Sequence, residues 1–341
     1  MKKVVGLGDM ICGLNAPGYL KLIQTDRFDV FYTGAEANVL AALSYMNVPT
    51  DFVTRLPDND IAKAAVANLR KYGLGTSHIA TGGSRMAVMF VETGAAQRSS
   101  KVVFDRYNTG VCGMKPSHFD WDGIFDNADT IVISGITPAL SPDAATTTLY
   151  AAEEARKRGV FVSCDINYRA SLWSYEDCRI YMEKILPYID QFIINEDHAK
   201  KILGVSAPGD CYQENGLLND DGCDIVAKEI SGRYGPGTVA LTRRLTISAS
   251  DTVWGAMICE NGRPYHSRMY SIHVVGRIGA GDAFAAGLIY SRMNGFDPQK
   301  KTDFATACGV LKHSISMDFN LVSASEALEL AENRDYGRVN R

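Results

Sequence analysis

Short apolar segments alternate with segments of helical periodicity along most of this chain, and this alternation restricts its fold more than any other feature. Strands are expected at residues 3–7, 51–55, 130–134, 160–165, 191–194 and 238–242. Helices are expected at residues 35–46 and 59–72, and most of the later strands are also followed by helical segments. Strands connected through helices run parallel, so the pattern predicts an α/β fold whose mostly parallel sheet is covered on both faces. Active sites in such sheets lie beyond the carboxyl ends of the strands.

Two regions, at about residues 11–33 and 85–112, break this alternation. Short strands without crossover helices are expected there, and they would form a small accessory sheet. No repeat or low-complexity segment stands out, and the polar stretch at residues 206–222 is interpreted as a surface loop. We therefore expect residues 1–341 to form one domain that carries these two segments as insertions.

Composition favours small-molecule chemistry. The 341 residues are 46% hydrophobic with a net charge of −4, and the absence of any basic run argues against a nucleic-acid or membrane-surface footprint. Neither a signal peptide nor a membrane-spanning run is expected. The eight cysteines are scattered without a close C-x-x-C pair, which argues against structural zinc and favours reduced thiols. These features predict a cytoplasmic protein.

The junction at residues 279–282 is the most informative about function. Gly279, Ala280 and Gly281 precede a helical run, and such glycines leave backbone N–H groups uncovered at the positive end of a helix. An anion such as a phosphate would fit there. Asp282 would repel that anion unless it takes a proton from an attacking group, although it could also simply cap the helix. The functional interpretation is phosphoryl transfer to a hydroxyl.

Residues 274–290 resemble the C-terminal signature of ribokinase-like sugar kinases, also called the phosphofructokinase-B family. Within this stretch, residues 277–282 resemble the 2-keto-3-deoxygluconate kinase branch, and the similarity covers nearly the whole chain. The resemblance implies a three-layer α/β/α core with a β-sheet lid, formed by the two inserted segments, that closes over the sugar. It also implies an ATP- and Mg²⁺-dependent kinase, with Asp282 as general base and Gly279, Ala280 and Gly281 holding the developing charge. Copies are expected to associate through the lid.

The resemblance implies a set of substrate contacts, some of which depart from the family pattern. Arg106 and Arg169 would bind a sugar-acid carboxylate through paired N–H donors. Met89 and Phe104 stand where the branch commonly places tyrosines, so the identity of the sugar acid stays open. The expected substrate-binding residues are Gly34, Asn38, Met89, Phe104, Arg106, Asn167, Arg169, Asp282 and Asp318.

The nucleotide side shows two further departures. Asn195 resembles the start of an N-x-x-E element that organises magnesium, but His198 occupies its acidic position, and Glu196 and Asp197 beside it are the candidates to compensate. Gly276 replaces an aspartate that helps to hold a monovalent cation in relatives, which predicts little potassium stimulation and a gain of turnover from Gly276→Asp. The residues expected to bind the nucleotide are Asn195, Thr242, Arg243, Gly279, Gly281 and Lys312; the metal ligands are left open.

The sequence therefore predicts ATP-dependent phosphorylation of a sugar-acid hydroxyl, most simply 2-keto-3-deoxygluconate to its 6-phosphate. Two alternatives within the family are a kinase for another sugar and a catalytically weakened sugar or nucleotide binder, the latter suggested by Gly276 and His198. A dinucleotide-dependent oxidoreductase is remote. Gly6, Gly8 and Gly13 follow an early strand, but the dinucleotide fingerprint requires its third glycine at the position of Ile11.

Overall fold

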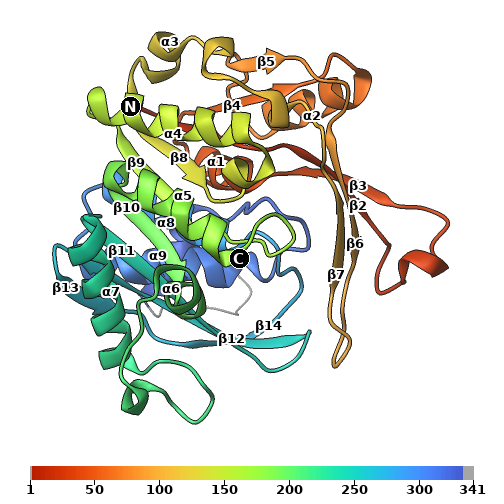
Figure 1. Ribbon diagram of the computed structural model, residues 1–341. Helices are drawn as coiled ribbons and strands as arrows, with labels where there is room; N and C mark the ends of the chain where they lie inside the picture. Colours follow the sequence, from red (N-terminus) through yellow and green to blue (C-terminus); the bar gives the residue numbers. More distant parts are fainter. Residues whose placement is uncertain (1, 333–341) are drawn as a thin grey trace.

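The computed structural model describes residues 2–332 and shows a large sheet between two helical layers, with a smaller sheet at one side (Figure 1). The large sheet has the strand order β13-β12-β11-β10-β9-β8-β1-β4-β5, with β14 beside β12. Its strands are β1 (Lys3–Leu7), β4 (Thr50–Leu56), β5 (Ile79–Thr81), β8 (Ala128–Ser134), β9 (Phe161–Asp165), β10 (Gln191–Asn195), β11 (Thr238–Thr246), β12 (Asp251–Glu260), β13 (Arg263–His266) and β14 (Tyr270–His273). The pairs from β5 to β11 are parallel, and the three last strands are antiparallel.

Ten α-helices lie within residues 2–332. They are α1 (Ala35–Tyr45), α2 (Asp60–Lys71), α3 (Trp121–Phe125), α4 (Pro142–Lys157), α5 (Tyr175–Ile185), α6 (Glu196–Leu203), α7 (Asp220–Tyr234), α8 (Ala280–Met293), α9 (Pro298–Lys312) and α10 (Ala324–Ala331). Short 3-10 helices are η1 (Leu22–Gln24), η2 (Val111–Gly113), η3 (Pro116–His118), η4 (Thr137–Leu140), η5 (Leu186–Tyr188) and η6 (Gly209–Cys211). None of the helices in this range has the length and apolar character needed to cross a membrane.

The two faces of the large sheet carry separate hydrophobic cores. Alternate side chains of one strand point to opposite faces, so Phe192 and Ile194 of β10 pack in a core with α3 to α7, while Ile193 packs in a core with α1, α2, α8, α9 and α10. All three side chains are buried. This double coverage explains why the strands read as short, continuous apolar runs, and it confirms the predicted three-layer architecture.

The lid is a separate four-stranded sheet with the order β3-β2-β6-β7, built from β2 (Ile11–Asn15), β3 (Asp29–Thr33), β6 (Ala87–Glu92) and β7 (Lys101–Asp105). Figure 1 shows it projecting from the body on the side where β1 and β8 end. The strands β2 and β6 are parallel, whereas the two outer pairs are antiparallel. The accessory sheet predicted from the sequence is thus confirmed.

The last parallel strand, β11, differs from its prediction. It continues beyond Thr242 to Thr246 and then turns into antiparallel β12 rather than into a helix. Pairing with β12 satisfies the backbone groups of residues 243–246, although their polar side chains do not mark a buried strand. The extension brings further side chains of β11 to the edge where ligands are expected.

Candidate active site

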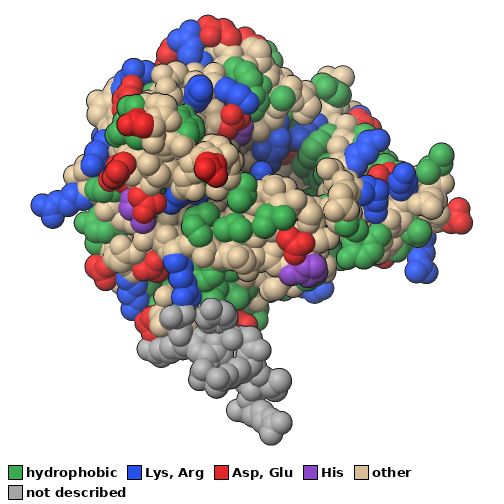
Figure 2. Space-filling view, turned by 90° about the horizontal axis from the view of Figure 1, so that it is seen from below, with side chains coloured by type: hydrophobic (Ala, Val, Ile, Leu, Met, Phe, Trp, Pro, Cys, Tyr) green, Lys and Arg blue, Asp and Glu red, His purple; other side chains and the backbone are tan. Residues whose placement is uncertain are grey.

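A cavity of about 640 Å³ opens between the carboxyl ends of the parallel strands and the lid. Figure 2 shows this face of the molecule hollowed, with Lys or Arg side chains in the hollow. Most of the residues predicted from the sequence line the cavity: Gly34, Asn38, Met89, Phe104, Arg106, Asn167, Arg169, Asn195, Thr242, Gly279, Ala280, Gly281, Asp282 and Asp318. The arrangement follows from the topology, because parallel strands end at one edge of a sheet.

The glycine-containing turn before α8 has the backbone geometry expected of an anion cradle. Gly279 has φ of 87°, a left-handed conformation that favours glycine, and a Cβ there would lie 2.4 Å from the carbonyl oxygen of Asp318. No side chain caps the start of α8, so its first N–H groups face the cavity without an internal acceptor. The turn therefore presents backbone donors and the positive helix end to a ligand.

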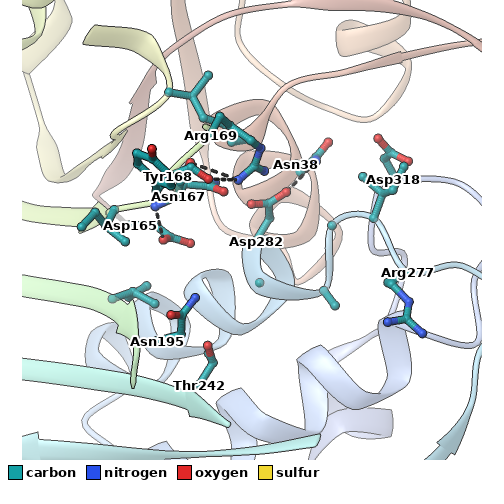
Figure 3. Close-up of a pocket in the computed structure, with 18 of the residues that line it drawn as sticks. Asn38, Asp165, Asn167, Tyr168, Arg169, Asn195, Thr242, Arg277, Asp282 and Asp318 are labelled. Carbon is teal, nitrogen blue, oxygen red and sulfur yellow. Dashed lines mark hydrogen bonds between the residues drawn. The ribbon is translucent and has the colours of Figure 1, made fainter. Parts of the chain in front are cut away.

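Asp282 lies in the first turn of α8 and points toward the same cavity (Figure 3). Burial raises the pKa of its carboxyl to about 7, and the charges of Asp165 and Asp318 act in the same direction. The hydrogen bond from Asn38 Nδ2, at 2.7 Å, and the charge of Arg169 oppose this rise. A carboxyl with a pKa near neutrality can accept a proton efficiently at physiological pH.

Arg106 is buried at the end of β7, with its guanidinium carbon 3.7 Å from the centroid of the Phe104 ring. Its Nε and Nη2 atoms have no hydrogen-bond partner within the described residues. Burial lowers the pKa of Arg106, whereas the charge of Asp9 raises it and that of Arg169 lowers it. The free donors on this charged group are suited to an anionic ligand atom inside the cavity.

Arg169 reaches the cavity from the loop after β9. Its Nη1 donates to the carbonyl oxygens of Asn167 and Tyr168, both at 3.0 Å. Asn167 has φ of 39°, and its backbone N–H donates to Oδ1 of Asp165 at 2.8 Å. These contacts fix the loop so that Arg169 lies above Asp282, as Figure 3 shows.

Met89 and Phe104 face each other in register on β6 and β7 and line the lid side of the cavity. Both also belong to the small hydrophobic core of the lid, with Ile11 beside them. The lid therefore presents an apolar wall to the ligand. Tyrosines at these two positions would instead present hydroxyl groups.

Asn195 ends β10 and caps α6 on the opposite wall of the cavity. Its Oδ1 accepts the backbone N–H of His198 at 2.8 Å, and its Nδ2 lies 3.0 Å from His198 Nδ1. Burial lowers the pKa of His198. The neighbouring carboxylates do not compensate freely for the missing acidic residue: Glu196 accepts from Leu218 N at 3.0 Å, and Asp197 pairs with Lys201 at 2.8 Å.

Two residues expected to bind the nucleotide lie outside the cavity. Arg243 points to the opposite face of β11 from Thr242, where its Nη1 pairs with Asp220 at 2.7 Å. Lys312 is fully buried, and its Nζ donates to the carbonyl oxygen of Ile315 at 3.1 Å. Strand alternation directs Arg243 away from the cavity, and Lys312 lies behind the turn, with its Cε 3.3 Å from the position of a Cβ at Gly279. Nucleotide binding by these two residues stays a prediction.

The structure also corrects the expectation for Gly276. Its backbone packs so closely against the segment after α9 that a Cβ would lie 2.0 Å from the carbonyl oxygen of Ile315. Aspartate therefore cannot replace Gly276 without a shift of the backbone.

Among the cavity residues that were not predicted as ligands from the sequence are Asp9, Asp165 and Arg244. Asp9 is 3% exposed and its Oδ2 has no partner within the described residues; burial raises its pKa to about 7, and Arg106 opposes this. Asp165 also has its pKa raised, to about 6, mainly by burial. Both carboxylates follow or end an apolar strand, which is the signal that would have indicated them. Arg244 carried no such signal, because its strand was expected to end at Thr242.

The metal that the family implies has no dedicated cage. Within residues 2–332, no three or more His, Cys, Asp or Glu side chains are grouped so as to hold an ion. Mg²⁺ commonly keeps several waters and binds through one or two carboxylates together with substrate phosphates. The oxygen donors of Asp165 and Asn195 at the cavity fit that type of binding.

Comparisons with known proteins agree with this architecture. A model of the pfkB family of carbohydrate kinases matches residues 1–222. A 2-dehydro-3-deoxygalactonokinase of Haloferax volcanii is 27% identical and aligns over 98% of either chain, and a 2-dehydro-3-deoxygluconokinase of Thermoproteus tenax is 27% identical over 97% of this chain and 94% of its own.

Among solved structures, a crystal structure of 2-dehydro-3-deoxygluconokinase from Thermotoga maritima is 43% identical with a TM-score of 0.93, covering 97% of this chain and 98% of that one. The similarity extends over both the large sheet and the lid. The resemblance inferred from the sequence is confirmed, and the chain belongs to the pfkB family of carbohydrate kinases.

Proposed function

We propose that this protein transfers the terminal phosphate of ATP to a hydroxyl of a keto-deoxy sugar acid, with 2-keto-3-deoxygluconate giving its 6-phosphate. One observation carries the proposal: Asp282, whose pKa lies near neutrality, stands at the end of an anion cradle in a cavity that also contains Arg106 and Arg169. A proton acceptor, an anion site and free guanidinium donors are the parts that phosphoryl transfer to an anionic sugar requires.

Asp282 would accept the proton of the attacking hydroxyl. Asn38 holds the carboxylate in position through its amide, which is itself oriented by Thr33 Oγ1 donating to Asn38 Oδ1 at 3.0 Å. The N–H groups of residues 279–281 would stabilise the negative charge that grows on the transferred phosphoryl group. Mg²⁺, arriving with ATP, would neutralise phosphate charge, with Asp165 and Asn195 as the side chains that hold it or its waters.

The sugar acid would be oriented by charge at one end and by shape along the lid. Arg106 and Arg169 would bind its carboxylate, and the unpaired oxygens of Asp9 and Asp318 would accept hydrogen bonds from its hydroxyls. The relatives named above are kinases of 2-dehydro-3-deoxy sugar acids that differ in the sugar part of their names, which supports the substrate class. The apolar pair Met89 and Phe104 offers no hydrogen bond by which the lid would distinguish such sugars.

A substrate panel tests the proposal. ATP consumption is measured with 2-keto-3-deoxygluconate, 2-keto-3-deoxygalactonate, fructose and ribose at equal concentrations. We expect the two sugar acids to be used with specificity constants at least tenfold above those of the neutral sugars. Turnover that is confined to neutral sugars would replace this proposal by a kinase for another sugar.

The alternative of a weakened binder is favoured by one observation, the hydrogen-bonded Asn195–His198 pair at the position of the acidic metal-binding element. It is separated from the kinase by measuring binding and turnover on the same preparation. Calorimetric binding of ATP and sugar acid, together with no ATP consumption, would identify the protein as a binder.

We further propose that two copies associate through the lid. The outer residues Ile23, Val30 and Val103 are 91%, 58% and 41% exposed, which is a large apolar area for an unpaired sheet. Light scattering during size-exclusion chromatography measures the mass, and Val30→Lys is expected to shift a dimer toward monomer. A monomeric parent would contradict this proposal.

A further inference from the structure

Arg244 is a cavity residue that the reaction described above does not use. It lies on β11, where alternation directs Thr242 and Arg244 toward the cavity and Arg243 toward Asp220 on the other face. The side chain of Arg244 is exposed, and it forms no hydrogen bond or ion pair with any residue from 2 to 332. A cationic side chain that lines a ligand cavity without a partner indicates an anionic ligand.

Arg277 lies against the same end of β11. Its Nη2 donates to the carbonyl oxygens of Ser248 and Ala249 at 3.1 and 3.3 Å, and its Nη1 is 3.5 Å from Thr246 Oγ1. Thr246 is two residues beyond Arg244 and therefore on the same face of the strand. The contacts hold the guanidinium of Arg277 beside the cavity, next to that of Arg244.

No carboxylate in the described part of the chain forms an ion pair with Arg244 or Arg277. The partial loss of water around the Arg244 guanidinium lowers the pKa of Arg244, and the charge of Arg277 acts in the same direction, as expected for neighbouring like charges. The nearby imidazole of His313 is kept uncharged: burial lowers its pKa to about 4, and the charges of both arginines act in the same direction. Two guanidinium groups that line one cavity, neither paired with a carboxylate of residues 2–332, leave a site for a multiply charged anion.

We propose that Arg244 and Arg277 form a clamp for the phosphate chain of the nucleotide, continuous with the anion cradle. Arg277 precedes Gly279 by only two residues, so a phosphate chain that reaches the cradle passes the two guanidinium groups. Figure 3 shows Arg277 and Arg169 on different sides of Asp282, which separates the clamp from the arginines assigned to the sugar acid. Guanidinium groups bind phosphate oxygens through paired donors.

This inference rests on the proposed kinase function but can be tested without catalysis. Binding of inorganic tripolyphosphate, ATP and AMP is measured by titration calorimetry in the presence of EDTA, for the parent, Arg244→Ala and Arg244→Lys. Because charge-assisted hydrogen bonds are lost, Arg244→Ala should weaken the binding of tripolyphosphate and of ATP by roughly 10- to 100-fold. The affinity for AMP, which has one phosphate, should change less than twofold. Arg244→Lys should retain part of the affinity for tripolyphosphate and ATP because it keeps the charge.

Arg263→Ala is the matched control. Arg263 lies on β13 of the same sheet, and its exposed side chain forms no hydrogen bond or ion pair with the described residues, so its replacement removes one positive charge away from the cavity. It should leave tripolyphosphate affinity within twofold of the parent. Calorimetry with the sugar acid should also be unchanged in Arg244→Ala, which excludes general damage to the site.

The possible outcomes test the phosphate clamp and the proposed kinase reaction separately. If the parent phosphorylates sugar acids but Arg244→Ala binds tripolyphosphate as tightly as the parent, the clamp is wrong and the kinase stands. An equal loss of AMP and ATP affinity would also overturn the clamp. If tripolyphosphate binding depends on Arg244 while no sugar is phosphorylated, the clamp stands and the proposed reaction fails.

Discussion

Asn38 donates a hydrogen bond to Asp282 across 244 positions of sequence, at a distance of 2.7 Å. The amide comes from α1, which follows the first lid segment, and the carboxylate from the start of α8, so the contact links the sugar side of the cavity to the anion cradle. An amide can donate to a carboxylate but cannot itself take up the proton, so it orients the base without competing for that role.

Replacing the base is the most direct test of the reaction. Asp282→Asn keeps the size of the side chain but removes its proton affinity, so turnover should fall by about 10²- to 10⁴-fold. ATP binding measured by calorimetry should stay within a few-fold of the parent. The exposed Asp58→Asn serves as the control. A folded Asp282→Asn enzyme with near-parental turnover would remove Asp282 from the role of base.

The pH dependence of the parent should reflect the same carboxyl. The pKa of Asp282 is raised to about 7, and only the ionised form accepts a proton, so kcat/KM should rise with pH through this region. Asn38 lowers that pKa; its removal in Asn38→Ala should therefore shift the acid limb of the kcat/KM profile to higher pH. An unshifted acid limb would show that the limb reports another group.

Arg106 and Arg169 should contribute more to the specificity constants for sugar acids than to those for neutral sugars. Arg106→Ala and Arg169→Ala are expected to lower the specificity constant for 2-keto-3-deoxygluconate on the order of 10²-fold, because a buried charge contact is lost, with a smaller effect on fructose. Arg85→Ala is the control, since Arg85 pairs with Asp105 at 2.6 Å on the exposed side of the lid. Equal losses for both sugars would contradict carboxylate recognition.

Glu36 should make the stability of the folded state depend on pH. It is 1% exposed and accepts a hydrogen bond from Ser134 Oγ at 2.7 Å, and burial raises its pKa from 4.5 to about 8. Because the pKa of Glu36 is higher in the folded state than in the unfolded state, the protonated carboxyl contributes its full stabilisation of the fold below pH 4.5. This contribution is lost as the pH rises toward 8. Glu36→Gln should therefore reduce the fall in Tm between pH 5.5 and 8.5.

This comparison is made by thermal unfolding of the parent, Glu36→Gln and Glu329→Gln, the last carrying its change on an exposed position of α10. Asp9 and Asp282 also have raised pKa values, so part of the fall should persist in Glu36→Gln. If Tm falls between pH 5.5 and 8.5 by as much in Glu36→Gln as in the parent, Glu36 does not contribute to the pH dependence of stability.

Gly276 gives a test of packing. A Cβ would lie 2.0 Å from the carbonyl oxygen of Ile315, so Gly276→Ala and Gly276→Asp should each destabilise the fold by about 1–3 kcal/mol and lower turnover. Gly232→Ala is the control, because nothing lies within 4 Å of a Cβ at that position on α7, and it should stabilise by roughly 0.5–1 kcal/mol.

Urea unfolding measures these changes, and a potassium titration at constant ionic strength is run on the same proteins. Little activation of the parent by potassium is still expected, because glycine offers no carboxylate to a cation. A Gly276→Asp protein that is as stable as the parent and more active would restore the original expectation from the sequence.

The sequence by itself determined the local features of this protein. Apolar strands alternate with helical segments because each element must bury one face, and this period is visible without any knowledge of distant contacts. The turn at residues 279–282 was equally predictable, since the need for a left-handed residue and for free N–H groups is local to the chain. The accessory sheet could be inferred because its strands lack crossover helices, whereas its role as a lid came from the family resemblance.

Only the tertiary structure decided which side chains meet. Arg243 and Arg244 are neighbours in sequence, but the extension of β11 by pairing with β12 sends one to Asp220 and the other into the cavity. Gly276 lies against Ile315 because α9 returns to the cradle, which no nearby residue indicates. Hydrophobic period and turn preference are properties of adjacent residues, whereas the face of a strand and the approach of two backbones depend on pairing partners tens to hundreds of residues away.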